Sequence, residues 1–292
     1  MRIPSPRTGH NPPDALDVVR VRHYVLVSVL AVIGFWITAA ITRGTVFLET
    51  FTGLVLLTAA LIFSTVGWVV WITIWRGLSL RALFGRPPKS VWAWTLVATG
   101  AVAAYLAARA DVTMIMPFLE QNAPTWLADF YTLSRRQPTE NKSISFVLRA
   151  VLVGLVFAGV FEEILFRGVI FQRWAHAWNR PVGALLASSV LFASLHGFTL
   201  NALAYALIAT LIYVRTRSLW APVALHMLLN SISILDLDPV EMVLAPIGLG
   251  AYQEYGWTCL VLSLILTGGI VWRCGGALHK PLPYSANIDG PQ

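Results

Sequence analysis

Two adjacent carboxylates and an arginine interrupt an apolar run near the middle of the chain, in the stretch Val160-Phe161-Glu162-Glu163-Ile164-Leu165-Phe166-Arg167-Gly168. A charged side chain at the centre of a bilayer costs on the order of 3 kcal/mol, so such groups usually serve a function. In a helix, Glu163 and Arg167 are i,i+4 neighbours, and we expect a structural ion pair between them. Glu162 points about 100° away from Glu163 in an α-helix and lacks that partner, which makes it the first candidate for catalysis.

The composition is that of a membrane protein. Of the 292 residues, 57% are hydrophobic and 12% are charged, and the mean hydropathy is +0.69. A soluble domain carries roughly a quarter charged residues. We therefore predict an all-α helical bundle that crosses the cell membrane several times, with the lipid bilayer as a partner. The net charge of +7 belongs to loops that orient the chain, and we expect no nucleic-acid partner.

The apolar runs predict about eight transmembrane helices. Most reach the ~17–25 residues that a span needs, and they cover residues 24–42, 46–75, 91–109, 145–171, 182–198, 200–214, 219–235 and 255–272. With both termini in the cytoplasm, most Lys and Arg residues of the loops face inward, as the positive-inside rule requires. The interpretation is therefore an N-in, C-in topology.

The same pattern divides the chain into four parts. We expect a disordered cytoplasmic tail at 1–23, N-terminal membrane helices and loops at 24–142, and a catalytic membrane core at 143–235. Residues 236–292 then hold an acidic outer loop, the last transmembrane helix and a cytoplasmic tail.

Three further polar residues fall inside predicted spans. His196 ends the fifth run, while His226 and Asn230 lie in the seventh. Their i,i+4 spacing puts His226 and Asn230 on one helix face, about 6 Å apart. Depths counted from the cytoplasmic helix ends at ~1.5 Å per residue place these groups and Glu162 at compatible levels. We expect one cluster, reached from the cytoplasmic side.

Three motifs occur here in order, Glu162-Glu163…Arg167, Phe192…His196 and His226…Asn230. Together they resemble the CPBP family, which comprises type II CAAX prenyl endopeptidases and the bacteriocin-processing and bacteriocin-immunity (Abi) proteins. The resemblance covers about residues 157–231. It implies an intramembrane endopeptidase, of the glutamate type or a metalloendopeptidase, that hydrolyses a peptide bond of a membrane-associated protein or peptide. The catalytic residues that it implies are Glu162, Glu163, His196, His226 and Asn230, with Phe192 as motif support.

The residue types suit this chemistry. Glu162 with His196 can bind and deprotonate a water, and His226 and Asn230 can stabilise the oxyanion. The set Glu162, His196 and His226 is also sufficient for a catalytic zinc, although the HExxH helix of zinc proteases is missing. We favour catalysis that requires no cofactor and keep zinc as the alternative.

Two other functions use the same residues. A proton- or ion-coupled transporter would employ Glu162, His196 and His226 as a relay, but the sequence shows no inverted repeat. A non-catalytic membrane partner protein would bind another membrane protein through the same cluster. Whether a substrate is a prenylated CAAX tail, a bacteriocin leader or another membrane peptide stays open at this level.

Overall fold

The computed structural model describes residues 16, 19–43, 51–125, 127, 159–234 and 255–289. All regular secondary structure in these ranges is helical, as predicted for an all-α protein. The chain divides into two compact units, Met1–Leu80 and Arg81–Gln292. The predicted acidic outer loop at 236–254 lies outside the described residues.

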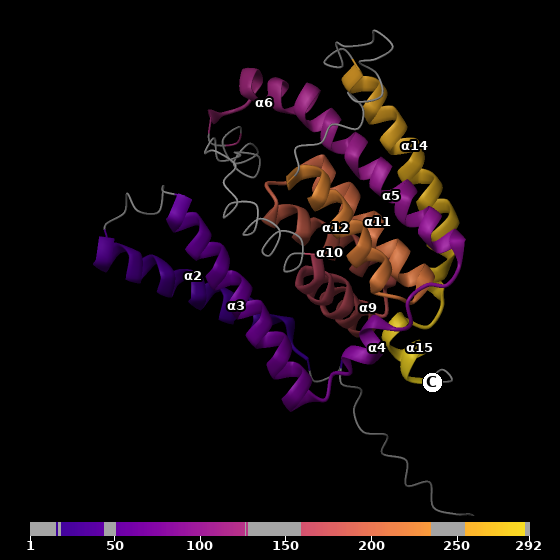
Figure 1. The fold of residues 1–292 in the computed structure, drawn as a ribbon, viewed down its shortest axis with the longest axis horizontal. Helices are drawn as coiled ribbons and strands as arrows, with labels where there is room; N and C mark the ends of the chain where they lie inside the picture. Colours follow the sequence, from indigo (N-terminus) through magenta and orange to yellow (C-terminus); the bar gives the residue numbers. More distant parts are fainter. Residues whose placement is uncertain are drawn as a thin grey trace, which may run out of the picture. The chain divides into compact units, whose positions relative to one another are not determined.

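The first unit is a helical hairpin of α2 (Val21–Arg43) and α3 (Phe51–Arg76) (Figure 1). The Tyr24 hydroxyl lies 3.0 Å from Thr65 Oγ1, and the Tyr24 ring packs on Trp68 with centroids 5.2 Å apart. Because the start of α2 contacts the second half of α3, the two helices run antiparallel. Helix α2 begins inside the segment expected to be a disordered tail, where Leu16 and Val19 are buried apolar residues.

The second unit holds the polar motifs. After α4 (Leu80–Phe84), its elements are α5 (Val91–Ala110), η2 (Asp111–Ile115), α6 (Met116–Asn122), η4 (Ile164–Phe171), α9 (Gln172–Trp178), α10 (Pro181–Leu195), α11 (Leu200–Thr216), α12 (Trp220–Ile234), α14 (Gly256–Cys274), η7 (Gly275–His279) and α15 (Pro283–Asp289).

Helix α11 is the centre of this unit. It contacts α5, α10, α12, α14 and η4. Its own buried residues lie on all of its faces, as in a core helix. Its first turn is anchored from another helix, because the Asp111 carboxylate accepts hydrogen bonds from the backbone N–H groups of Leu200 (3.1 Å) and Asn201 (2.8 Å). A carboxylate at a helix N-terminus is favourable for the helix dipole. The helix ends at Arg217, which has a left-handed φ of 54°.

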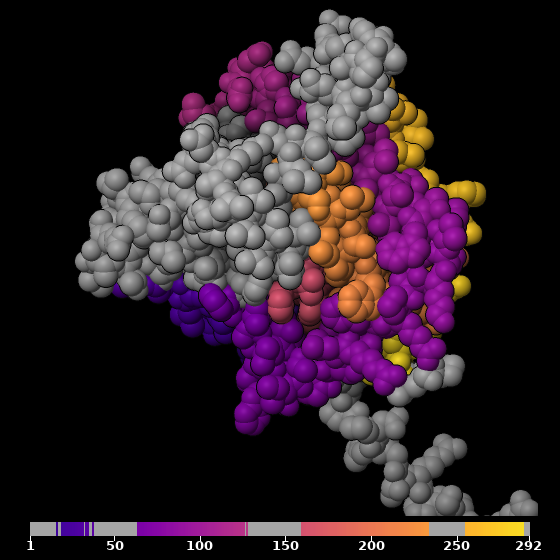
Figure 2. Space-filling view, viewed as in Figure 1, coloured from indigo at the N-terminus to yellow at the C-terminus, as the bar shows by residue number. Residues whose placement is uncertain are grey.

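Helices α5 and α14 pack against each other, and both reach the molecular surface (Figure 2). Large exposed side chains on this pair include Trp94, Val102, Val261, Ile265 and Trp272. Among the described residues, two helical stretches are long and apolar enough to cross a membrane, Val91–Asn122 and Gly256–His279. An apolar surface of this extent suits lipid contact. Shorter apolar helices at Pro181–Leu195 and Leu200–Thr216 lie among the other predicted runs; the count of eight spans and the N-in, C-in topology stay predictions.

Candidate active site

The segment that carries the two glutamates is a π-helix. Residues 159–162 and Ile164–Phe171 have π-helical hydrogen bonding, whereas the apolar pattern of this run predicts an α-helix. A π-helix bonds each residue to the fifth one along the chain, and short π segments occur frequently at functional sites. The angle of about 100° expected between Glu162 and Glu163 belongs to α-helical geometry, and here π-helical residues stand on both sides of Glu163.

Gln172 marks the point where the π-helix gives way to α9. Its side-chain amide donates to the Gly168 carbonyl at 2.9 Å and to the Tyr213 hydroxyl at 2.9 Å. Its side-chain oxygen accepts from the backbone N–H of Tyr284 at 2.8 Å. The fully buried Gln172 side chain thus provides a hydrogen-bond donor for a helix carbonyl where the π-helix ends, and it links this point to α11 and α15.

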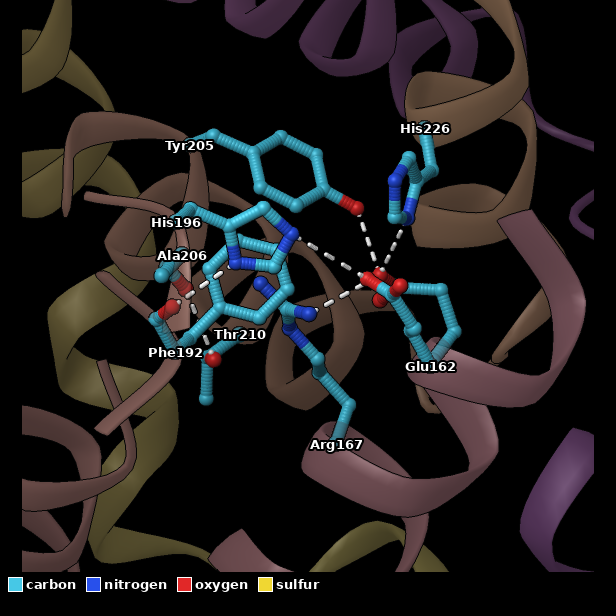
Figure 3. Close-up of polar contacts among 9 residues, drawn as sticks. Glu162, Arg167, Phe192, His196, Tyr205, Ala206, Thr210 and His226 are labelled. Carbon is cyan, nitrogen blue, oxygen red and sulfur yellow. Dashed lines mark hydrogen bonds and ion pairs between the residues drawn. The ribbon is translucent and has the colours of Figure 1, made fainter. Parts of the chain in front are cut away.

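Glu163 lies at the centre of the cluster. Its side chain is fully buried, and its Oε1 atom accepts from Arg167 Nη1 at 2.8 Å, from the Tyr205 hydroxyl at 2.5 Å and from His226 Nδ1 at 2.9 Å. Figure 3 shows these contacts converging from the π-helix, α11 and α12. A buried charge is tolerated where it is paired and hydrogen-bonded, and here one oxygen receives all three donors.

Aromatic rings enclose Arg167. Its guanidinium carbon lies 4.7 Å from the centre of the Phe192 ring and 4.9 Å from that of Tyr205. Cations favour the faces of aromatic rings, most of all where water is excluded. Arg167 is almost completely buried, so its charge is compensated by Glu163 and by these two rings.

The hydrogen bond of His226 fixes which ring nitrogen carries a proton. A carboxylate oxygen only accepts hydrogen bonds, so the Nδ1 atom of His226 donates to Glu163. The Nε2 atom is then the nitrogen that can act on a substrate. His226 is 6% exposed, and Asn230 follows one turn later on the same helix, α12, with an intermediate exposure.

The second pair, Glu162 and His196, is more accessible. Their side chains are 31% and 38% exposed, and Glu162 Oε2 lies 3.7 Å from His196 Nε2. His196 Nδ1 lies 2.8 Å from the Phe192 carbonyl oxygen, and the two rings stack at 4.2 Å. Since a carbonyl only accepts, Nδ1 carries the proton. In the neutral ring, Nε2 therefore turns its lone pair towards Glu162.

The structure thus brings together Glu162, Glu163, Arg167, Phe192, His196 and His226. Sequence reasoning missed Tyr205, which contacts four of them: Glu163, Arg167, Phe192 and His226. Its signal was a hydroxyl inside an apolar run, since a buried tyrosine hydroxyl usually needs a hydrogen-bond partner.

The zinc alternative considered from the sequence concerns Glu162, His196 and His226. In the described part of the chain, no group of three or more His, Cys, Asp or Glu side chains is placed to hold a metal ion. Each histidine directs Nδ1 to a protein acceptor, His196 to a carbonyl and His226 to Glu163. This leaves each Nε2 as the atom that would bind a metal, because a metal-bound histidine usually donates its other ring N–H to a carbonyl or carboxylate, so zinc stays the alternative for Glu162, His196 and His226.

Comparison with known proteins supports the resemblance drawn from the motifs. Residues 144–232 match the family model of the type II CAAX prenyl endopeptidase Rce1-like proteins. The chain is also 29% identical over 122 residues to the protein of Bacillus subtilis (strain 168) named "Putative membrane peptidase YdiL", an alignment that covers 39% of this chain and 50% of the relative.

The chain therefore spans about half the length of the curated relative that it matches. No solved structure matches the chain. The matched region contains all three motifs and the polar cluster described above. Residues 144–232 are thus similar to type II CAAX prenyl endopeptidase Rce1-like proteins, in the same region where the three motifs resemble the CPBP family.

Proposed function

We propose that the protein is an intramembrane endopeptidase in which Glu162 and His196 activate a water molecule. The observation that carries this proposal is that Glu162 Oε2 and His196 Nε2 face each other, 3.7 Å apart. That separation is too long for a direct hydrogen bond. Both atoms are acceptors while His196 is neutral, so one water can donate a hydrogen bond to each.

Glu162 is the proposed general base. Its Oε2 atom is buried and accepts no hydrogen bond from the residues that the structure describes, which leaves it available to a water. Transfer of a water proton to Glu162 produces the hydroxide that adds to the carbonyl carbon of the scissile peptide bond. The same proton then passes to the leaving amine as the C–N bond breaks, which regenerates the carboxylate.

His226 and Asn230 are the proposed oxyanion donors. His226 donates from Nε2 when its ring is doubly protonated, and the buried Glu163 carboxylate then compensates the added charge. The Asn230 amide lies on the same helix one turn away. Hydrogen-bond donors placed where charge develops are commonly worth ~3 kcal/mol each in the transition state. In this scheme Glu163 and Arg167 support the site and do not exchange protons with the substrate.

The proposed substrate is a membrane-associated protein or peptide. The family description includes CAAX prenyl endopeptidases, so a prenylated C-terminal peptide is the first substrate to try, with a bacteriocin leader as the second. We propose that the protein lies in the cell membrane with the site reached from the cytoplasmic side. The proposed scheme requires no cofactor.

Purified protein in detergent or proteoliposomes tests the proposal. Glu162→Gln keeps size and polarity but removes the base, so we expect cleavage to fall ~10²-fold or more with an unchanged thermal melt. His196→Ala should behave similarly, and Asn230→Ala should lose less. The matched control is Glu120→Gln, the same substitution at an exposed glutamate of α6, which should leave cleavage unchanged.

Three outcomes would change the assignment. Full activity of Glu162→Gln would exclude Glu162 as the base. Loss of wild-type activity with a chelator, restored by zinc, would replace the metal-free scheme. Proton flux into liposomes without peptide cleavage would identify a transporter, and neither flux nor cleavage would leave a non-catalytic partner protein.

A further inference from the structure

We propose that Tyr205 is a positioning residue for this reaction: through Glu163 it fixes the ring orientation and the proton-bearing nitrogen of His226. This inference rests on the proposed endopeptidase function and extends it to a residue outside the three motifs. Tyr205 lies on the central helix α11, is 4% exposed, and donates to Glu163 Oε1 at 2.5 Å.

The Tyr205 ring contacts three other members of the cluster, one of them Phe192 at a centroid distance of 5.4 Å. Its ring centre lies 4.9 Å from that of His226, with the planes inclined by 58°. The same ring lies 4.9 Å from the Arg167 guanidinium carbon. Tyr205 thus contacts Glu163 through its hydroxyl, and Arg167 and His226 through its ring (Figure 3). A substrate next to Glu162 and His196 has no need to touch this buried side chain.

The Tyr205 hydroxyl holds the Glu163 carboxylate relative to a different helix than Arg167 does. Arg167 and Glu163 belong to the same helical segment, so their ion pair holds the carboxylate relative to its own helix. Tyr205 holds the same oxygen relative to α11, the helix that packs against both the π-helix and α12. His226 comes from α12, and its Nδ1 depends on where that oxygen lies. The three-helix geometry at Glu163 therefore depends on the Tyr205 hydroxyl.

Removing the hydroxyl should affect turnover more than substrate binding. In Tyr205→Phe the ring contacts with Arg167 and His226 remain, and Glu163 keeps two of its three donors. The oxygen is then free to shift relative to α12, and His226 shifts or rotates with it. Small displacements of groups that act in the transition state lower kcat, because they leave substrate binding intact and spoil the reacting geometry.

The chain offers a matched control on the same helix. Tyr213 is fully buried on α11, and its hydroxyl donates to the Leu83 carbonyl at 2.9 Å and accepts from Gln172 at 2.9 Å. It contacts no residue of the proposed reaction. Tyr213→Phe therefore removes a buried hydroxyl of the same kind and should lower stability while leaving kcat unchanged.

The experiment measures kcat, KM and the detergent thermal melt of the wild type, Tyr205→Phe and Tyr213→Phe on one membrane-associated peptide. We expect Tyr205→Phe to lower kcat about tenfold with little change in KM, and to melt no lower than Tyr213→Phe. A double-mutant cycle with His226→Ala separates positioning from general stability. Once His226 is absent, Tyr205→Phe should lower kcat no further.

A second pair of variants covers a folding failure of Tyr205→Phe. Tyr205→Gln offers an amide donor, whereas Tyr205→Leu has a similar size and no donor, so the Gln variant should retain the higher kcat. Equal activity of these two variants would overturn the proposal. So would a wild-type kcat for Tyr205→Phe, or the same loss from it with and without His226. A wild type that cleaves no peptide would defeat the proposed function and the role of Tyr205 together; each of the other results defeats the positioning role alone.

Discussion

At Glu163, one buried oxygen accepts from an arginine, a tyrosine and a histidine. A buried ion pair adds little net stability, because both charges lose their hydration. Removing one member is different, since the remaining charge stays buried without compensation. The contribution of this cluster to stability is therefore best measured by first removing one charged partner and then also neutralising the other.

Arg167→Ala should lower the free energy of unfolding by roughly 3–5 kcal/mol, because it leaves the Glu163 carboxylate without its cation. Combining it with Glu163→Gln removes the unpaired charge and should recover part of the loss. A detergent thermal melt provides the measurement, and Arg180→Ala, at an exposed position before α10, is the control. The absence of any recovery in the double variant would argue against coupling between the two side chains.

Among the elements, the π-helix has the most demanding backbone. Its wider turns require other partners for carbonyl groups at its ends, and Gln172 supplies one to Gly168. The same side chain holds α11 through Tyr213 and α15 through the Tyr284 N–H. One buried polar side chain thus ties the end of the π-helix to α11 and α15.

Gln172→Leu should therefore destabilise the protein by about 1–3 kcal/mol, since it leaves several buried polar groups without their partner. The matched control is Gln121→Leu at an exposed position of α6, which should be close to neutral. Thermal melts of both variants in one detergent decide the comparison. Equal melting temperatures would show that the Gln172 contacts do not support the π-helix.

At the scale of the whole molecule, four separate segments meet at one end of the second unit. Asn287 of α15 donates to the carbonyls of Ala82 in α4 (2.8 Å) and Arg217 after α11 (3.0 Å), and Gln172 joins the same end to Tyr284. All four segments belong to parts of the chain that the charge pattern assigns to the cytoplasm. Their proximity agrees with a common side of the membrane.

Cysteine labelling tests this topology with an impermeant reagent on intact cells. Arg86→Cys should label only after the membrane is permeabilised, and Ala245→Cys should label from outside. The native cysteines, Cys259 and Cys274, are both buried and unbridged, so the background should be low. The reverse pattern, with position 86 labelled from outside and position 245 protected, would invert the orientation.

The helical class and most helix positions follow from sequence because they depend on local properties. An apolar run of sufficient length predicts a helix wherever it lies, and the runs at 182–198, 200–214 and 219–235 overlap α10, α11 and α12. The neighbours Glu163 and Arg167 are likewise close in space because they are close in sequence. The motifs could be recognised for the same reason, since each is confined to a few residues.

Tertiary structure decided the features that join distant residues. The contact between Tyr205 and Glu163 spans 42 positions and that between His226 and Glu163 spans 63, so no local periodicity reports them. The π-helical backbone is another such feature, because an apolar run predicts a helix but not whether its carbonyl groups bond to the fourth or the fifth residue along the chain. Sequence alone determined which polar groups enter the helical core. Packing of α11 between its neighbours decided which of these groups meet, and the long-range contact with Glu163 decided which nitrogen of His226 carries the proton.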